Sequence, residues 1–159
     1  MKNILIVLCV VLSGCNMTQN HKLSTTLPST SYTGKGTQSG PMLIGAMGPV
    51  GMAVGIAIDA GIAKEISKQI NIHQQDWTEK LTLALNTYFV SQSIYTIDKI
   101  DMFAERKNND LAYAQVLVSA KEKNWCIQTM AVELDKLKSS DIFWSQLLLG
   151  VESQSLCDA

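Results

Sequence analysis

Apolar and polar residues follow different periods in different parts of this chain, and these periods predict its elements. From Ile62 to Phe89, large apolar residues recur close to every fourth position, with lysine, glutamate and glutamine on other faces. Such spacing is typical of a helix with one apolar side. The sequence therefore predicts a long amphipathic helix, or two helices with His73 between them and Asp76 capping the second.

The C-terminal part of the chain follows the shorter period of a strand. Residues 112–120 place alanine or valine at every second position, with mostly polar or aromatic residues between them. After a turn at 121–124, residues 125–134 are expected to pair with this strand in antiparallel fashion. Residues 94–103 are ambiguous in period, but their β-branched content favours a third strand.

A short C-terminal helix is expected after the sheet. Ser140 and Asp141 are candidate caps for a helix over residues 142–149, which Gly150 would close. A long helix, a small antiparallel sheet and a short helix together predict an α+β domain over residues 64–159.

Residues 41–63 form a glycine-rich apolar segment, and no charged residue occurs from Gly36 to Ile58. The segment contains two series of small residues at helical spacing, which let another backbone approach closely. Gly48-Pro49 indicates a break, with proline at the first position of the following helix. The candidate helix-packing residues are Gly51 and Gly55 in one series, and Ala53, Ala57 and Gly61 in the other.

Three interpretations of this segment remain open at the sequence level. Residues 43–61 are either a helix buried in the protein's own core, or part of a hairpin that inserts into a membrane or self-associates. The hairpin would run over residues 42–47, turn at Gly48-Pro49 and continue as a longer helix from Val50. The third possibility is a single helix from Pro41 that spans the membrane. It would carry Pro49 in its middle and Asp59 near one end, and both are energetically unfavourable within a bilayer.

The N-terminus has the form of an export signal. Lys2 is followed by nine apolar residues, Ile4 to Leu12, which is too short a run to span a bilayer but fits a signal peptide. The next residues, Leu12-Ser13-Gly14-Cys15, resemble the lipobox of bacterial lipoproteins. That resemblance implies cleavage of a signal peptide, residues 1–14, and acylation of Cys15. The alternative is an ordinary signal peptide with an incidental cysteine.

The lipobox resemblance also implies a location. Asn16 occupies the position where aspartate retains lipoproteins at the inner membrane in enteric bacteria, so the outer membrane is the expected destination. Residues 15–40 are rich in serine, threonine, glycine and amides, and are expected to form a flexible, lipid-anchored tether. The lipid bilayer is therefore the first expected partner, reached through Cys15.

Four cysteines occur in the chain, and the expected processing of the N-terminus leaves two of them as free thiols. Cys9 leaves with the signal peptide and Cys15 is acylated, which leaves Cys126 and Cys157. In an oxidising compartment such a pair indicates a disulfide. A buried thiol at Cys126 and a reactive nucleophile are the competing interpretations.

Charge and motifs exclude several classes of function. Without Lys2 the mature chain has 12 basic and 14 acidic residues, a net charge of −2, so no basic surface suggests nucleic acid. The chain contains no hydrolase, zinc-protease or phosphate-loop motif. His73 and Asp76 supply two metal ligands without a third, so neither an enzyme nor a metal or other cofactor is expected. Trp77, Trp125 and Trp144 could line a ligand cleft, but are more typical of a core.

The glycine-rich segment is similar to those of bacterial outer-membrane lipoproteins, including conjugal surface-exclusion lipoproteins, whose apolar segment also ends in an acidic residue. The expected function is a non-catalytic accessory of an envelope machine for secretion, conjugation, pilus assembly or surface exclusion. Residues 41–63 would associate with membrane, with a protein partner or with further copies. The alternative is a periplasmic ligand-binding or chaperone-like lipoprotein with residues 43–61 in its own core.

Overall fold

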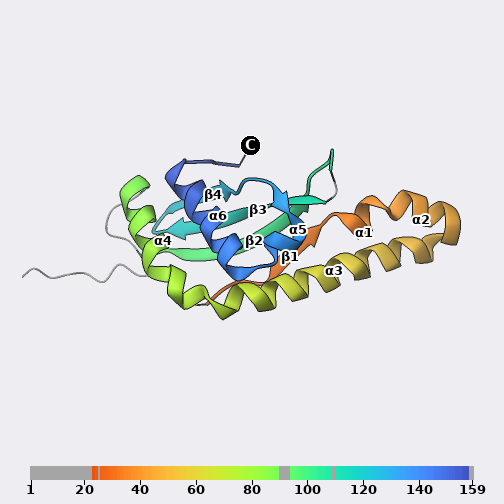
Figure 1. Ribbon diagram of the computed structural model, residues 1–159, viewed down its shortest axis with the longest axis horizontal. Helices are drawn as coiled ribbons and strands as arrows, with labels where there is room; N and C mark the ends of the chain where they lie inside the picture. The colour runs from red at the N-terminus through yellow and green to blue at the C-terminus, as the bar shows by residue number, and fades with distance from the viewer. Residues whose placement is uncertain (1–22, 25, 90–93, 109, 158–159) are drawn as a thin grey trace, which may run out of the picture.

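The computed structural model describes residues 23–157 except residues 25, 90–93 and 109, and shows an α+β fold (Figure 1). A helical arm projects from one end of a body built of a sheet and helices. In chain order the elements are β1 (Thr30–Thr33), α1 (Lys35–Gln38), α2 (Gly40–Met47), α3 (Pro49–Ile72), α4 (Gln74–Tyr88), β2 (Thr96–Ala104), β3 (Leu111–Ala120), β4 (Lys123–Gln128), β5 (Val132–Glu133), α5 (Leu134–Leu137) and α6 (Ser140–Glu152).

The sheet has the order β1-β2-β3-β4, with the short β5 paired to the start of β3. β2, β3 and β4 pair antiparallel as the alternating pattern predicts. β1 pairs parallel to β2, with Thr30 opposite Ile100 and Thr33 opposite Phe103. The sheet is therefore mixed, and the expectation of a purely antiparallel sheet is wrong in this one strand.

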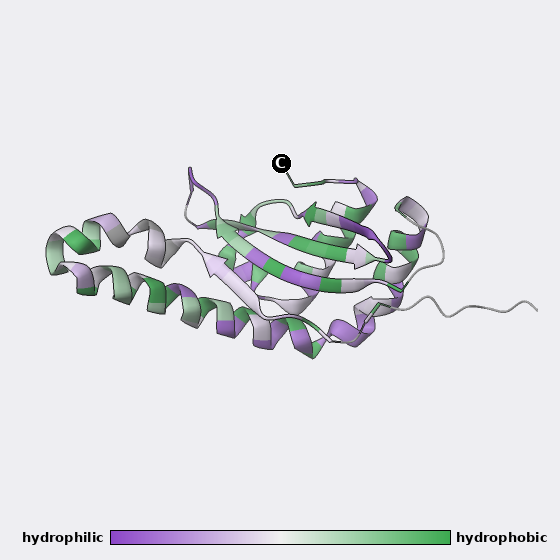
Figure 2. Cartoon of the chain, turned by 180° about the vertical axis from the view of Figure 1, so that it is seen from behind, coloured by the Kyte–Doolittle hydropathy of each residue, from purple (hydrophilic) through white to green (hydrophobic). Residues whose placement is uncertain are grey.

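Helices cover one face of the sheet, and the core lies between the two layers. The even-numbered residues of β3 are buried there, and α6 lies across this face (Figure 1). Trp144 of α6 is fully enclosed and donates its indole N–H to the carbonyl of Ile70, 3.1 Å away, which joins α6 to the end of α3. No helix of the described chain covers the other face of the sheet (Figure 2).

The N-terminal boundary of the folded body differs from the sequence prediction. Residues 15–40 were expected to be a tether, but Leu23 is fully buried and residues 30–33 form β1. The Leu23 N–H donates to the Thr82 hydroxyl at 3.2 Å, and the Ser24 N–H donates to the carbonyl of Tyr95 at 2.8 Å. These partners lie far along the chain, so local composition gives no sign of them.

The helix boundaries also refine the prediction. The part of the glycine-rich segment that follows Gly48 and the first half of the amphipathic segment form one continuous helix, α3, so no boundary falls between residues 63 and 64. The break comes at His73, and Asp76 lies in the first turn of α4 instead of capping it. Gly150 lies inside α6 and does not close it, since the helix continues to Glu152. A Cβ at Gly150 would meet the carbonyl oxygen of Gln128 at 3.0 Å. This close approach lets α6 pack on β4.

The second predicted strand of the hairpin is shorter than expected. β4 ends at Gln128, whereas the alternating pattern predicted pairing as far as residue 134. Beyond Gln128, the main-chain N–H of Thr129 still donates to the carbonyl of Ala114. The N–H of Ala114, however, donates to the Thr129 hydroxyl instead of to a main-chain carbonyl, and the regular pairing stops there. The chain then turns away and returns as β5.

Cys126 and Cys157 lie at disulfide distance, with their Cα atoms 5.4 Å apart. The Cys157 N–H donates to the carbonyl of Cys126 at 2.9 Å, and Leu156 forms an isolated bridge with Ile127. The C-terminal segment is thus held against β4.

We expect the oxidised protein to contain the Cys126–Cys157 disulfide and to be stabilised by it. Replacing both Cys126 and Cys157 by serine should lower the free energy of unfolding by about 3–4 kcal/mol, because the bond closes a loop of about 30 residues in the unfolded chain. Urea denaturation measures the loss, and reductant should destabilise the unsubstituted protein equally. Alkylation of both thiols in native protein without reductant would contradict the bond.

Candidate functional site

The apolar arm, defined as residues 40–58, comprises α2, the turn at Gly48 and the first ten residues of α3. It contains only apolar residues, glycine and proline, and it projects beyond the sheet (Figure 1). Its large side chains are exposed, so the interpretation of residues 43–61 as a core helix is wrong. The exposed large side chains of the arm are Met42, Ile44, Met47, Val50, Met52, Val54, Ile56 and Ile58.

The arm is a helical hairpin, as one of the three sequence interpretations predicts. α2 ends at Met47, Gly48 adopts a positive φ of 65°, and α3 begins at Pro49. A left-handed conformation favours glycine, and proline at the first helical position loses no hydrogen bond. Among the described residues, no helix combines the length and apolarity that crossing a membrane requires.

One of the two series of small residues closes the hairpin. Gly51 lies against the backbone of Leu43, and Gly55 lies against the backbone of Gly36. A Cβ at Gly36, Gly51 or Gly55 would collide with these backbones, so close packing explains the three glycines. The other predicted series faces outward, since Ala53, Ala57 and Gly61 are exposed and a Cβ at Gly61 would meet nothing within 4 Å.

Asp59 fastens the arm to the body. Its carboxylate is 3% exposed and accepts the N–H groups of Gly34 at 3.1 Å, Gly36 at 2.7 Å and Thr37 at 2.9 Å, together with the hydroxyl of Thr37. The N–H groups at the start of a helix lack acceptors within that helix. Here the Asp59 carboxylate of the neighbouring helix α3 is the acceptor. The link between β1 and α1 is therefore tied to α3 at the point where the arm leaves the sheet.

These hydrogen bonds decide the ionisation of Asp59. Burial by itself raises the pKa of the Asp59 carboxyl, but the hydrogen bonds from the Thr37 side chain and from the backbone of Gly34, Gly36 and Thr37 outweigh it. The net effect holds the pKa of Asp59 below its ordinary value. Asp59 is consequently a saturated structural anion, and its oxygens are committed to the joint instead of being available as a general base.

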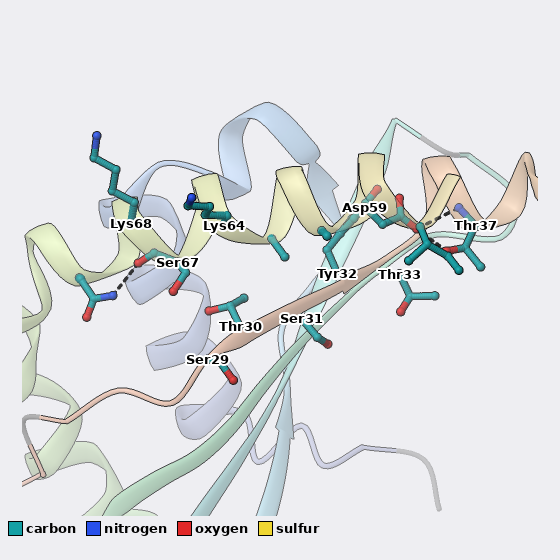
Figure 3. A pocket seen from close by; sticks show the side chains of 14 residues that line it. Ser29, Thr30, Ser31, Tyr32, Thr33, Thr37, Asp59, Lys64, Ser67 and Lys68 are labelled. Atoms are coloured by element: carbon teal, nitrogen blue, oxygen red, sulfur yellow. Dashed lines mark hydrogen bonds between the residues drawn. The ribbon is translucent and has the colours of Figure 1, made fainter. Parts of the chain in front are cut away.

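A groove of about 680 Å³ runs from this joint between β1 and α3 (Figure 3). Hydroxyl groups of Ser29, Thr30 and Ser31 line one wall, and Lys64 and Lys68 lie along the other. Among the described lining residues the one acid is Asp59, which accepts the hydroxyl of Thr37. The hydroxyl of Ser31 donates to the carboxylate of Asp101 on β2 at 2.6 Å. The groove thus offers mainly hydroxyl and ammonium groups for polar contacts.

The other candidate residues do not converge. The Nδ1 atom of His73 lies 3.2 Å from a carboxylate oxygen of Asp76, both groups are exposed, and the described residues contain no cluster of three metal ligands. Trp144 is buried, whereas Trp77 donates its indole N–H to Asp141 and Trp125 packs edge-on against Phe89. The three tryptophans have separate partners and line no common cleft. Cys15 and Asn16 lie outside the described residues.

The role of Asp59 was not predicted from the sequence, although its position contained a signal. Gly51, Gly55 and Asp59 are spaced by four residues, so the acid continues the glycine series on the inner side of α3. An acid at the end of an otherwise apolar packing surface requires hydrogen-bond donors opposite it. Which donors these are depends on β1 and α1, which the sequence did not predict.

Comparison of the chain with known protein families, with curated proteins and with solved structures finds no match.

Substitution of glycines should distinguish the inner and outer series. Gly55→Ala places a methyl group against the backbone of Gly36, and we expect a loss of about 1–3 kcal/mol in the free energy of unfolding. Gly61→Ala meets open space on the same helix and should be neutral or stabilising by up to about 1 kcal/mol. Urea denaturation followed by circular dichroism measures both. Equal effects of the two substitutions would contradict the packing.

Replacement of Asp59 should give a pH-dependent loss. Asp59→Asn removes a charged acceptor of four hydrogen bonds and should cost about 1.5–3 kcal/mol at neutral pH. Because the pKa of Asp59 is lowered on folding, this contribution is complete above the ordinary aspartate pKa of about 4 and declines as the pH falls through the lower, folded value.

The measurement is the difference in unfolding free energy between the unsubstituted and Asp59→Asn proteins across the acidic range. Asp98→Asn, at an exposed carboxylate, is the control and should have little effect. A difference that grows towards low pH would contradict the argument.

Proposed function

We propose that this chain is a non-catalytic lipoprotein of the bacterial outer membrane that serves as an accessory or assembly component of an envelope machine. Such a component suits a machine for secretion, conjugation, pilus assembly or surface exclusion. In this proposal a lipid on Cys15 anchors the chain, the apolar arm associates with membrane or with further copies, and the α+β body binds a protein partner.

The observation that carries the proposal is the exposure of the apolar arm. Soluble monomers rarely expose a large continuous apolar surface, and such surfaces mark contacts with proteins or membranes. A large apolar side chain gains roughly 1.5–3 kcal/mol when it moves from full exposure to full burial. Eight such side chains on the arm are exposed, which gives a strong drive towards a further apolar contact.

The rival function, a periplasmic ligand-binding or chaperone-like lipoprotein, loses its main support. That alternative required residues 43–61 inside the core, where they would shape the body around a ligand. The exposed positions of Met52 and Ile56 leave the core to the sheet, α4 and α6 instead. The groove beside β1 is open to solvent, whereas pockets for small ligands enclose most of the ligand's surface.

The lipid and the arm provide two separate attachments. A single acyl chain holds a protein only marginally at a membrane, whereas two or more signals give stable anchoring. The arm can act when the lipid is absent, so the two contributions are separable by experiment.

The test uses the protein exported with an ordinary cleavable leader in place of residues 1–15, which removes the lipid. We expect this form to sediment with membranes or to form oligomers. Ile56→Lys should reduce that association severalfold, because it places a charge on the exposed apolar surface of the arm, where a lysine is costly. Ile72→Lys is the matched control on the same helix, since Ile56 and Ile72 are 56% and 57% exposed.

Membrane fractionation and analytical ultracentrifugation measure the two forms of association. If the unlipidated protein behaves as a freely soluble monomer, the proposed role of the arm is wrong. An equal loss for Ile56→Lys and Ile72→Lys would show that the arm does not provide the contact.

A further inference from the structure

We infer that the apolar arm enters a single leaflet of a lipid bilayer tip first, with the turn at Gly48 near the bilayer midplane and Asp59 near the hydrocarbon boundary. This inference rests on the proposed function and selects lipid, instead of a second copy, as the partner of the arm.

The distribution of apolar residues around α3 favours lipid over one protein partner. Successive helical residues point about 100° apart, so Val50, Met52 and Ile58 face different directions. All three are exposed, and the inner side at Gly51 and Gly55 is filled by the hairpin itself. A helix that docks on one partner needs one apolar side, whereas a helix that is apolar all round belongs in an apolar solvent.

The length of the arm matches one leaflet. From Pro49 to Ile58 the helix rises about 15 Å at 1.5 Å per residue. The hydrocarbon core of a bilayer is about 30 Å thick, so half of it is also about 15 Å. The apolar part of the arm therefore reaches the midplane when Ile58 lies at the edge of the hydrocarbon.

The first exposed charge on α3 lies as far from the tip of the arm as the headgroup surface lies from the bilayer midplane. Asp59 is buried in its joint and does not face the surroundings, so the first exposed charge on α3 is Lys64, followed by Glu65 and Lys68. Lys64 lies about 22 Å along the helix from Pro49. Half of a bilayer including headgroups is about 20–22 Å, so Lys64 meets the headgroup surface.

The length of the N-terminal segment allows the lipid on Cys15 to enter the same leaflet. Leu23 and Ser24 are fixed beside α4, where the Gln74 amide donates to the carbonyl of Ser24 at 3.4 Å. Gln74 follows directly after the end of α3, and Ile72 at that end lies about 12 Å of helical rise beyond Lys64. Eight residues separate Cys15 from Leu23 and span at most about 26–29 Å. An inserted arm and an inserted lipid are thus compatible.

The test measures depth in vesicles of phosphatidylethanolamine with a minority of phosphatidylglycerol, into which the full lipidated protein is reconstituted. A polarity-sensitive fluorophore is attached to a cysteine introduced by Met47→Cys, Ile58→Cys or Ile72→Cys. The unsubstituted protein taken through the same labelling is the blank. Lipids with a nitroxide near the chain ends or near the glycerol act as quenchers at two depths.

We expect the label at position 47 to emit to the blue of the label at 72 and to be quenched most by the nitroxide near the chain ends. The label at 58 should be quenched most by the nitroxide near the glycerol, and the label at 72 by neither. A label at position 47 that remains accessible to an aqueous quencher overturns the inference. If that protein nevertheless cross-links into oligomers, self-association stands and only the choice of lipid fails.

Discussion

The carboxylate of Asp59 is the contact on which the relation between arm and body depends. It binds the N–H groups at the start of α1 and thereby holds the chain that leaves β1 against α3. One turn before Asp59 in α3, Gly55 allows the backbone of Gly36 to touch the helix, and one turn before that Gly51 allows the same for Leu43. A carboxylate and two glycines at intervals of four residues therefore form the side of α3 that faces α1 and α2.

Because these inner residues are small, the large apolar residues of the arm other than Leu43 lie on its outer side. A hairpin closed by larger side chains would bury part of its own apolar surface between its helices. Here the helices meet through backbone, and Met42, Met52 and Ile56 remain 82%, 50% and 56% exposed in the part of the chain that the structure describes. The body is the opposite case, since Trp144, Phe143 and Leu147 of α6 are enclosed against the sheet and α3. One chain thus combines a conventional core with a surface that favours an apolar environment.

Periodicity predicted the parts of the fold whose partners are close in sequence. The β3–β4 hairpin and the α2–α3 hairpin follow from alternation, turn residues and the Gly48-Pro49 break. β1 was not predicted, because it has four residues, mostly polar, and its pairing partner lies about 70 residues away in β2. The enclosure of Leu23 by α4 was missed for the same reason. Asp59 was seen only as the end of an uncharged run, since its donors belong to α1.

The unbroken course of α3 has a consequence for orientation. The helix extends without interruption from the tip of the arm at Pro49 to Ile72, where the carbonyl of Ile70 receives the indole of Trp144. A stiff rod of about 36 Å transmits any tilt at one end to the other. The contact that fixes the tip of the arm therefore also fixes the orientation of the body. It determines which way the sheet face that no helix of the described chain covers is turned (Figure 2).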